Sequence, residues 1–221
     1  MFIGIGTPIP EIANLPGSSR PGGGSSPAFE YTAIDNSFSM EFDSASSSYI
    51  QTGSNLLDST FTISMWFNAS SYPSTNPALI SQFISGISGR FFIGVRDNGG
   101  RKITAFLNSH NYGSTIINTG VWYHLALVND SNTVTLYLNG SIDGNFTFPT
   151  SVVNTNTLIG TLEPTSNPWD GYIDETAIWT SALSENTIQA IYDATANNPG
   201  KVADLSETPE GAPAAWYRIG S

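Results

Sequence analysis

The chain has 221 residues, of which 39% are hydrophobic and 12% aromatic; this content supports a sizeable core and excludes a disordered protein. The formal net charge is −11, from 7 Lys and Arg against 18 Asp and Glu, and the longest basic run is Arg101–Lys102, so nucleic-acid binding is not expected. Cysteine is absent, which excludes disulfides and thiolate metal sites, and no apolar run approaches the ~20 residues of a membrane span, so membrane insertion is not expected.

Residues 1–30 differ from the rest of the chain, because "IPEIANLPGSSRPGGGSSP" is rich in Pro, Gly and Ser and has no helical or strand periodicity. A free tail and an arm that docks on a partner are both compatible with this composition. We favour the arm, because a solvated linker would avoid the apolar residues found here. These residues are Phe2, Ile3, Ile5, Ile9, Ile12 and Leu15.

From Tyr31 onward, short strands alternate with turns. In "FTISMWFNA" (residues 61–69), Phe61 and Ile63 are expected on one face and Trp66 on the other. The segments "RFFIGVR" and "KITAFL" follow as a hairpin. "VWYHLALVN" (121–129) is apolar on both faces, which predicts a central strand, and Asn139-Gly140 predicts a tight hairpin turn.

The segment "SENTIQAIYDA" (184–194) predicts the one helix, with Ser184 as N-cap and Ile188, Ile191 and Tyr192 on one face. Residues 196–213 are interpreted as a linker. Residues 214–221, which contain "AAWYRIG", are expected to form a last strand. The main domain is therefore placed at residues 31–195.

Three segments, "FTISMWFNA", "WYHLALVNDSNTVTLYLNG" and "GYIDETAIWTSALSENTIQAIYD", resemble in order and spacing the laminin-G-like branch of the concanavalin A-like lectin/glucanase superfamily. The resemblance covers about residues 36–194 and implies an all-β concanavalin A-like antiparallel β-sandwich (jelly roll) with one short helix, here preceded by the extended N-terminal arm. The family's usual first strand has no equivalent before Tyr31. The C-terminal "AWYRIG" is expected to fill that position.

The stretch "DGYIDETAIW" holds three carboxylates, of which Asp174 and Glu175 are adjacent. Glycosidases built on the superfold that this chain resembles place two carboxylates at alternate positions of one strand, because acid and nucleophile must share a face. Neighbouring residues of a regular strand lie on opposite faces, so Asp174 and Glu175 are not expected to form such a dyad. We therefore predict no catalytic residues and no enzymatic activity.

Calcium is suggested by the resemblance, since related domains hold one Ca²⁺ through an Asp in the "G-x-I-D-E" strand. Asp174 is then the first ligand to consider and Asp43 its partner, because Ca²⁺ takes six to eight hard oxygen ligands. The alternative is that Asp174 accepts backbone N–H bonds and stabilises a loop. Both interpretations stay open, and no other cofactor is expected.

Aromatic rings beside polar side chains are typical of sugar sites. Tyr112 and Trp169 fall in expected loops, and His110 precedes Tyr112, so these three are the predicted glycan contacts. Trp66 is interpreted as a core residue beneath a second layer. His124, in the central strand, is interpreted as a buried histidine rather than a catalytic base.

The arm followed by this fold resembles bacteriophage virion proteins of the marine or cyanophage type. This resemblance implies a non-enzymatic structural protein on the virion surface, a capsid decoration or a tail or neck appendage subunit present in many copies. The arm would bind other virion proteins of the capsid, neck or tail, and the domain would also adhere to host glycans. The alternative is a secreted, lectin-like carbohydrate-binding module that depends on calcium or not.

Overall fold

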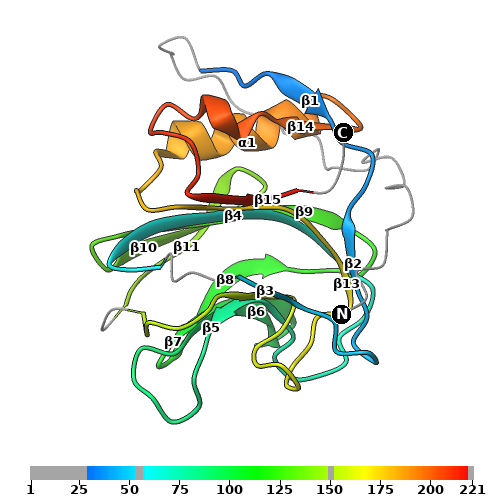
Figure 1. The fold of residues 1–221 in the computed structure, drawn as a ribbon, viewed down its shortest axis with the longest axis vertical. Coiled ribbons are helices and arrows are strands. Elements are labelled where there is room, and N and C mark those ends of the chain that lie inside the picture. Colours follow the sequence, from blue (N-terminus) through cyan, green and yellow to red (C-terminus); the bar gives the residue numbers. More distant parts are fainter. Residues whose placement is uncertain (1–28, 53–56, 149–151, 219–221) are drawn as a thin grey trace.

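The computed structural model describes residues 29–52, 57–148 and 152–218, and all but two of its strands form two antiparallel sheets that stack on each other (Figure 1). The seven-stranded sheet runs in the order β11 (Ser141–Thr147), β10 (Thr133–Leu138), β9 (Trp122–Asp130), β4 (Thr60–Ala69), β13 (Gly171–Trp179) and β15 (Ala215–Tyr217), with β2 (Met40–Phe42) also paired to β13. The six-stranded sheet runs in the order β3 (Ile50–Gln51), β12 (Leu158–Ile159), β5 (Ala78–Gln82), β6 (Phe91–Asp97), β7 (Arg101–Leu107) and β8 (His110–Ile116). The predicted antiparallel β-sandwich is confirmed.

The core between the sheets follows from strand alternation. Phe61 and Ile63 of β4 are fully buried between the sheets, as their spacing predicts. Strand β9 lies between β4 and β10 and is buried on both faces, with Leu127 toward the six-stranded sheet and Ala126 on the other side. The expected hairpin at Asn139 also forms: Asn139 and Gly140 both have positive φ, as a tight turn between β10 and β11 requires.

A third layer covers the outer face of the seven-stranded sheet (Figure 1). Helix α1 (Glu185–Ala196) begins after Ser184, whose side chain accepts a hydrogen bond from the N–H of Thr187, and it buries Ile188 and Ile191 against that sheet. Beside it, β1 (Ala33–Asp35) pairs with β14 (Lys201–Ala203), and the 3₁₀ helix η1 (Leu205–Glu207) follows. Residues 196–213 were predicted to be a linker; this is wrong over 201–207, because Val202 and Leu205 bury apolar side chains in the layer.

The C-terminal strand β15 pairs antiparallel with β13 at the edge of the seven-stranded sheet, where residues 176–178 face residues 215–217. Its Trp216 donates a hydrogen bond from Nε1 to Glu175 Oε2 at 2.7 Å. The expected strand within residues 214–221 therefore occupies a position in the sandwich next to β2, which pairs with the other half of β13.

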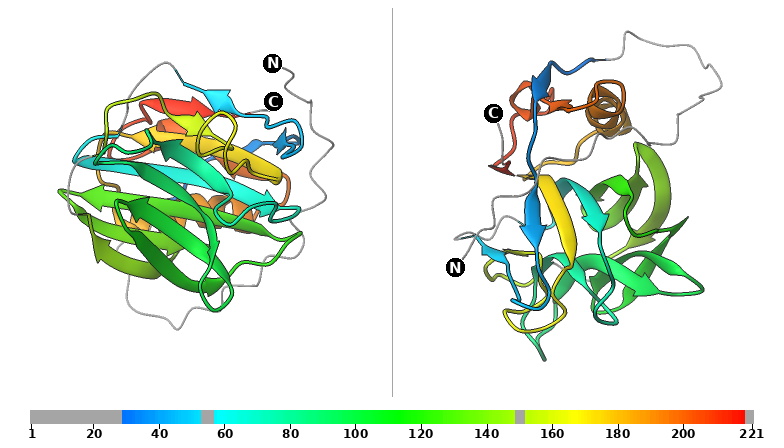
Figure 2. Two further views of the ribbon diagram at one scale, coloured as in Figure 1. Left: turned by 90° about the horizontal axis from the view of Figure 1, so that it is seen from below. Right: turned by 90° about the vertical axis from the view of Figure 1, so that its right-hand side faces the viewer.

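The outer face of the six-stranded sheet is covered differently. Seen from below, β6, β7 and β8 (green) lie in front of the other strands and no helix of the described chain covers them (Figure 2).

No helix in the described ranges has the length and apolarity to cross a membrane. The expected arm over residues 1–30, with Phe2, Ile3, Ile5, Ile9, Ile12 and Leu15, lies outside the described residues except for its last two positions.

Candidate functional site

The outer face of β6, β7 and β8, called the open face below, carries large side chains that strand alternation turns away from the core. In β6, Phe91 and Ile93 belong to the core between the sheets, so Phe92 and Arg96 lie on the open face. The register then places Phe106 of β7 opposite Phe92, and Lys102 opposite Arg96. The next strand adds His110 opposite Phe106.

Five rings pack against one another on this face. Phe92 and Phe106 stack with ring centroids 5.2 Å apart, and Phe106 meets the His110 ring edge to face at 4.8 Å. The His110 ring in turn stacks on Tyr112 at 5.9 Å with 18° between the planes, and Phe83 lies 6.2 Å from Phe106. We call these residues the ring cluster. Its outer members are half-buried, so part of each ring is open to solvent.

Polar groups fix the ring cluster. His110 Nδ1 is 3.0 Å from Thr104 Oγ1, which is fully buried, so the orientation of the imidazole is set. Burial and the nearby Arg96 guanidinium lower the pKa of His110, so the ring is neutral at neutral pH. The Arg90 guanidinium lies over the Phe83 ring, 5.5 Å from its centroid. A rigid row of partly exposed rings bordered by hydrogen-bonding groups suits an apolar sugar face with surrounding hydroxyls.

Two of the three predicted glycan contacts, His110 and Tyr112, lie in this cluster. Both were expected in a loop, whereas the structure places them on β8. The third, Trp169, is wrong as a glycan contact because its side chain is fully buried between the sheets, where its ring meets Phe67 edge to face at 5.8 Å. The apolar core takes the whole indole and leaves no ring face for a sugar.

The two predicted metal ligands do not meet. Asp43 is exposed and accepts a hydrogen bond from the N–H of Ala45, in a loop whose Ser44 hydroxyl donates to Asp170, the residue before β13. Asp174 lies four residues further along, buried and bonded to Asn36. Within the described ranges, no group of three or more His, Cys, Asp or Glu side chains gathers around one point. Calcium binding stays a prediction.

The expected separation of Asp174 and Glu175 is wrong. Glu175 has φ of +50°, and the register with β4 shifts between Asp174 and Ala177, so a β-bulge turns both side chains to the same face. Asn36 Nδ2 donates to Asp174 Oδ2 at 2.7 Å and to Glu175 Oε1 at 3.1 Å. Strict alternation could not reveal this, because the bulge adds a residue to one strand only.

This carboxyl pair is closed to substrates. Asp174 and Glu175 are only 2% and 4% exposed, because the layer with α1 covers them, and Trp216 and Arg218 approach Glu175 from β15 and the residue after it. Burial and then the neighbouring Asp174 raise the pKa of Glu175 to about 8. The Arg218 guanidinium, 3.6 Å away, opposes this shift but is itself partly solvated, so the first two causes prevail.

The two residues interpreted as core residues are confirmed as such. Trp66 is 4% exposed and stacks on Tyr192 of α1 at 6.0 Å. His124 is fully buried with Nε2 2.9 Å from Ser64 Oγ, and burial lowers its pKa to about 3, so it is neutral and has no access to a substrate.

Five residues of this face were not predicted as site residues: Phe92, Phe106 and the cations Arg90, Arg96 and Lys102. The signal lay in "RFFIGVR", where Phe91 and Phe92 must point to opposite faces, so one ring has to leave the core. The same parity puts Arg96 on the face of Phe92. Recognising the site required knowing that no third layer of the described chain covers this sheet, which the local pattern does not show.

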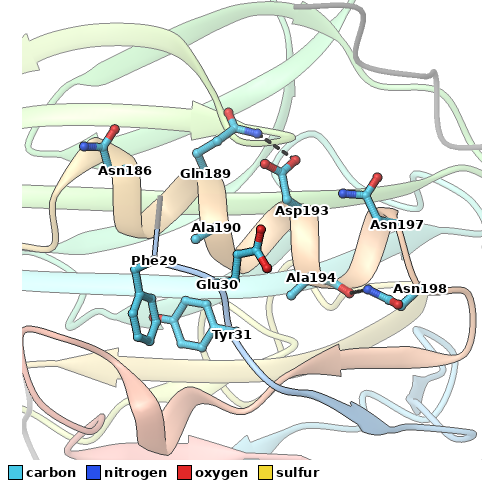
Figure 3. A pocket seen from close by; sticks show the side chains of 10 residues that line it. All are labelled: Phe29, Glu30, Tyr31, Asn186, Gln189, Ala190, Asp193, Ala194, Asn197 and Asn198. Carbon is cyan, nitrogen blue, oxygen red and sulfur yellow. Dashed lines mark hydrogen bonds between the residues drawn. The ribbon is translucent and has the colours of Figure 1, made fainter. Parts of the chain in front are cut away.

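A hollow of about 390 Å³ lies elsewhere on the molecule, over α1 and beside the segment that leads into β1 (Figure 3). Its walls are Phe29, Glu30 and Tyr31 on one side and mostly amide and acidic side chains of α1 on the other. Gln189 donates to Asp193 within its wall, at 2.9 Å. The hollow combines carboxylates with one partly exposed Phe ring and has no cation, so it offers a smaller stacking surface than the open face.

Comparison with known proteins agrees with the observed fold. A sequence model described as the concanavalin A-like lectin/glucanases superfamily matches residues 43–189. No curated protein matches. Among solved structures, a Bacteroides ovatus protein assigned to carbohydrate binding is similar, with a TM-score of 0.60, 17% identity and 87% of this chain covered; the chain spans 53% of that protein's length.

Two further structures have the same fold. Domain 4 of an extracellular arabinanase from Geobacillus stearothermophilus, solved in complex with arabinotriose, has a TM-score of 0.56 and 19% identity, and the match covers 76% of this chain and 81% of that one. A heptameric SAP-like pentraxin from Limulus polyphemus has a TM-score of 0.55 and 17% identity, and the match covers 71% of this chain and 85% of that one.

Proposed function

Because the chain belongs to the concanavalin A-like lectin/glucanase superfamily, we propose that it is a carbohydrate-binding module and that the open face is its binding surface. The observation that carries this proposal is the ring cluster, five packed rings on the face of the sandwich that the third layer leaves free. Domains of the same fold that bind oligosaccharides, such as the arabinanase domain with arabinotriose, support it.

Binding would use the partly exposed rings of Phe106, His110 and Tyr112 as platforms for the C–H faces of sugar residues. Burying those apolar surfaces releases water, and the rigid rings lose little conformational entropy. Hydroxyl groups of the sugar would bond to the Tyr112 hydroxyl and to Arg96 and Lys102 at the border. The neutral His110 ring holds Tyr112 in position through stacking.

The same face argues for binding without hydrolysis. Strands β5 to β8 contain a single carboxylate, Asp97, which lies exposed at the end of β6. Glycoside hydrolysis usually needs two carboxyl groups on either side of the scissile bond. The buried pair of Asp174 and Glu175 cannot supply them, because it lies under the third layer on the other side of the molecule.

Replacing Tyr112 with alanine is expected to weaken binding of the best glycan found on an array at least tenfold, because one stacking surface is lost, which is equivalent to ~1.4 kcal/mol or more. Phe38→Ala is the matched control, since Phe38 is an aromatic residue with 39% exposure away from the open face. Calorimetry should show unchanged affinity for the control. Wild-type affinity in Tyr112→Ala, or no glycan bound by the native chain, would contradict the proposal.

Attachment to a virion is a separate proposal that concerns residues 1–30. In that setting the arm binds a capsid, neck or tail protein, and the open face, at the virion surface, contacts host glycans. Deleting residues 1–30 is expected to abolish assembly while the sandwich keeps its melting temperature; incorporation of the truncated chain into particles would refute the anchor.

Calcium binding is tested by thermal unfolding. Equal melting temperatures with Ca²⁺ and with a chelator would contradict the predicted calcium site.

A further inference from the structure

Positive charge concentrates on the open face, although the molecule as a whole is strongly acidic. Four of the seven Lys and Arg residues of the chain fall within residues 90–102, on β6, β7 and their ends. Arg90, Arg96 and Lys102 border the ring cluster, while the fourth, Arg101, turns to the Tyr72 ring at 4.8 Å. This part of the surface is therefore cationic within a chain of net charge −11.

No carboxylate of the described residues forms an ion pair with these cations. Arg96 and Lys102 lie directly opposite each other on β6 and β7, an arrangement of like charges that destabilises a sheet. The two close contacts between a cation and a carboxyl group within the described ranges involve other cations, Lys201 with Asp35 and Arg218 with Glu175. Arg96 bonds instead to the neutral Asn76, with Nη1 2.5 Å from Oδ1, which orients the guanidinium without cancelling its charge.

The cations and the rings form one continuous surface. The register pairs Thr104 of β7 with Tyr112 of β8, and Arg96 and Lys102 form the next outward-facing pair along β6 and β7, so the two cations border the Tyr112 end of the ring cluster. At the other end, the Arg90 guanidinium lies over the Phe83 and Phe106 rings. A ligand that stacks on the ring cluster would therefore meet a positive group at either border.

Resting on the proposed carbohydrate-binding function, we infer that the open face selects acidic sugars, in which a carboxylate or sulfate group sits beside the stacked ring. Arg96 and Lys102 hold that anion, and the guanidinium fork of Arg96 suits a planar carboxylate or two sulfate oxygens. The anion relieves the repulsion between the two cations, so its binding is favoured more than either cation alone would achieve. Long polyanions gain little, because the acidic remainder of the surface repels them.

The test uses the full chain on an array that contains matched acidic and neutral glycans, with uronic-acid, sialic-acid and sulfated sugars beside their uncharged parents. Acidic glycans should give the strongest signals, and the acidic class that leads tells carboxylate from sulfate recognition. Binding of the leading glycan should weaken at least tenfold in the Arg96→Gln/Lys102→Gln double variant. It should also fall with rising NaCl in the native chain and much less in the double variant.

Lys201→Gln is the matched control, because Lys201 is a cation in the third layer, on the other side of the sandwich, and it should bind like the native chain. Melting curves check that each variant is folded. Neutral glycans bound as tightly as their acidic partners, with the double variant unaffected, would overturn the inference and leave carbohydrate binding intact. An array without any bound glycan would instead overturn the proposed function.

Discussion

Replacing Glu175 with glutamine should remove a loss of stability that the native protein suffers as the pH rises from 6 to 9. Burial and the adjacent Asp174 raise the pKa of Glu175 from 4.5 to about 8, so the folded protein keeps this carboxyl protonated at neutral pH while the unfolded chain releases the proton. Because the pKa of Glu175 is higher in the folded state, proton binding stabilises the folded protein, and this stabilisation is fully present below about pH 4.5. It is lost as the pH rises through about 8, because the unfolded state is then favoured by deprotonation.

The expected size of this loss follows from the pH interval between the unfolded and the folded pKa of Glu175. Between pH 6 and 9 the unfolding free energy of the native chain should fall on the order of 3 kcal/mol more than that of Glu175→Gln, at ~1.4 kcal/mol per unit up to the folded pKa. Glutamine keeps a similar shape and can still accept the hydrogen bond from Trp216 Nε1. Urea unfolding at pH 6, 7, 8 and 9 measures the difference directly.

Glu41→Gln is the control for this series, because Glu41 is exposed on β2 and its replacement should leave the native pH dependence in place. If the unfolding free energies of the native chain and of Glu175→Gln change in parallel with pH, Glu175 is already ionised in the folded protein. In that case the shared contact with Asn36 would have to hold two carboxylates at once, against the burial of both side chains.

Replacing Gly171 with alanine is expected to destabilise the protein by about 3 kcal/mol or more. Gly171 has φ of +138°, where a side chain is strained, and β13 passes so close to β4 here that an added Cβ would overlap the carbonyl oxygen of Asn68 and lie 2.7 Å from the Ser70 nitrogen. Both obstacles are backbone atoms within or next to a ten-residue strand, so neither can move without loss of pairing.

The Gly86→Ala variant distinguishes the cost of backbone strain from the cost of steric overlap. Gly86 has φ of +80°, but nothing lies within 4 Å of an added Cβ, so alanine there costs only the conformational term of ~1 kcal/mol. Thermal unfolding of both variants gives the comparison. Equal melting temperatures for the two would mean that β13 and β4 are further apart at Gly171 than the structure has them.

The core of the fold was predictable because its signals are local. Period-2 alternation in residues 61–69 and the two-faced apolar run at 121–129 determine which side chains are buried, and Asn139-Gly140 determines a turn. The short pairings β1 with β14 and β2 with β13 were not predictable, because three-residue strands carry too little pattern. Residues 201–207 looked like a linker for the same reason.

The candidate site was half predictable. Tyr112 and His110 stood out as aromatic groups in a polar segment, whereas Trp169 was misjudged because a polar neighbourhood in sequence says nothing about depth in the fold. Phe92, Phe106 and Arg96 were hidden because they come together only through the register of β6, β7 and β8. The bulge at Glu175 was likewise invisible, since it depends on how β13 meets β4.

The most direct test of the central claim is a map of the bound sugar on the protein. The isotope-labelled chain would be titrated with the glycan that binds best on the array, and amide shifts would be followed by NMR. We predict that the shifting amides cluster on β6, β7 and β8, around Phe92, Phe106, His110 and Tyr112. Shifts confined to the hollow over α1, around Asn186 and Asn197, would contradict the assignment of the open face as the carbohydrate-binding surface.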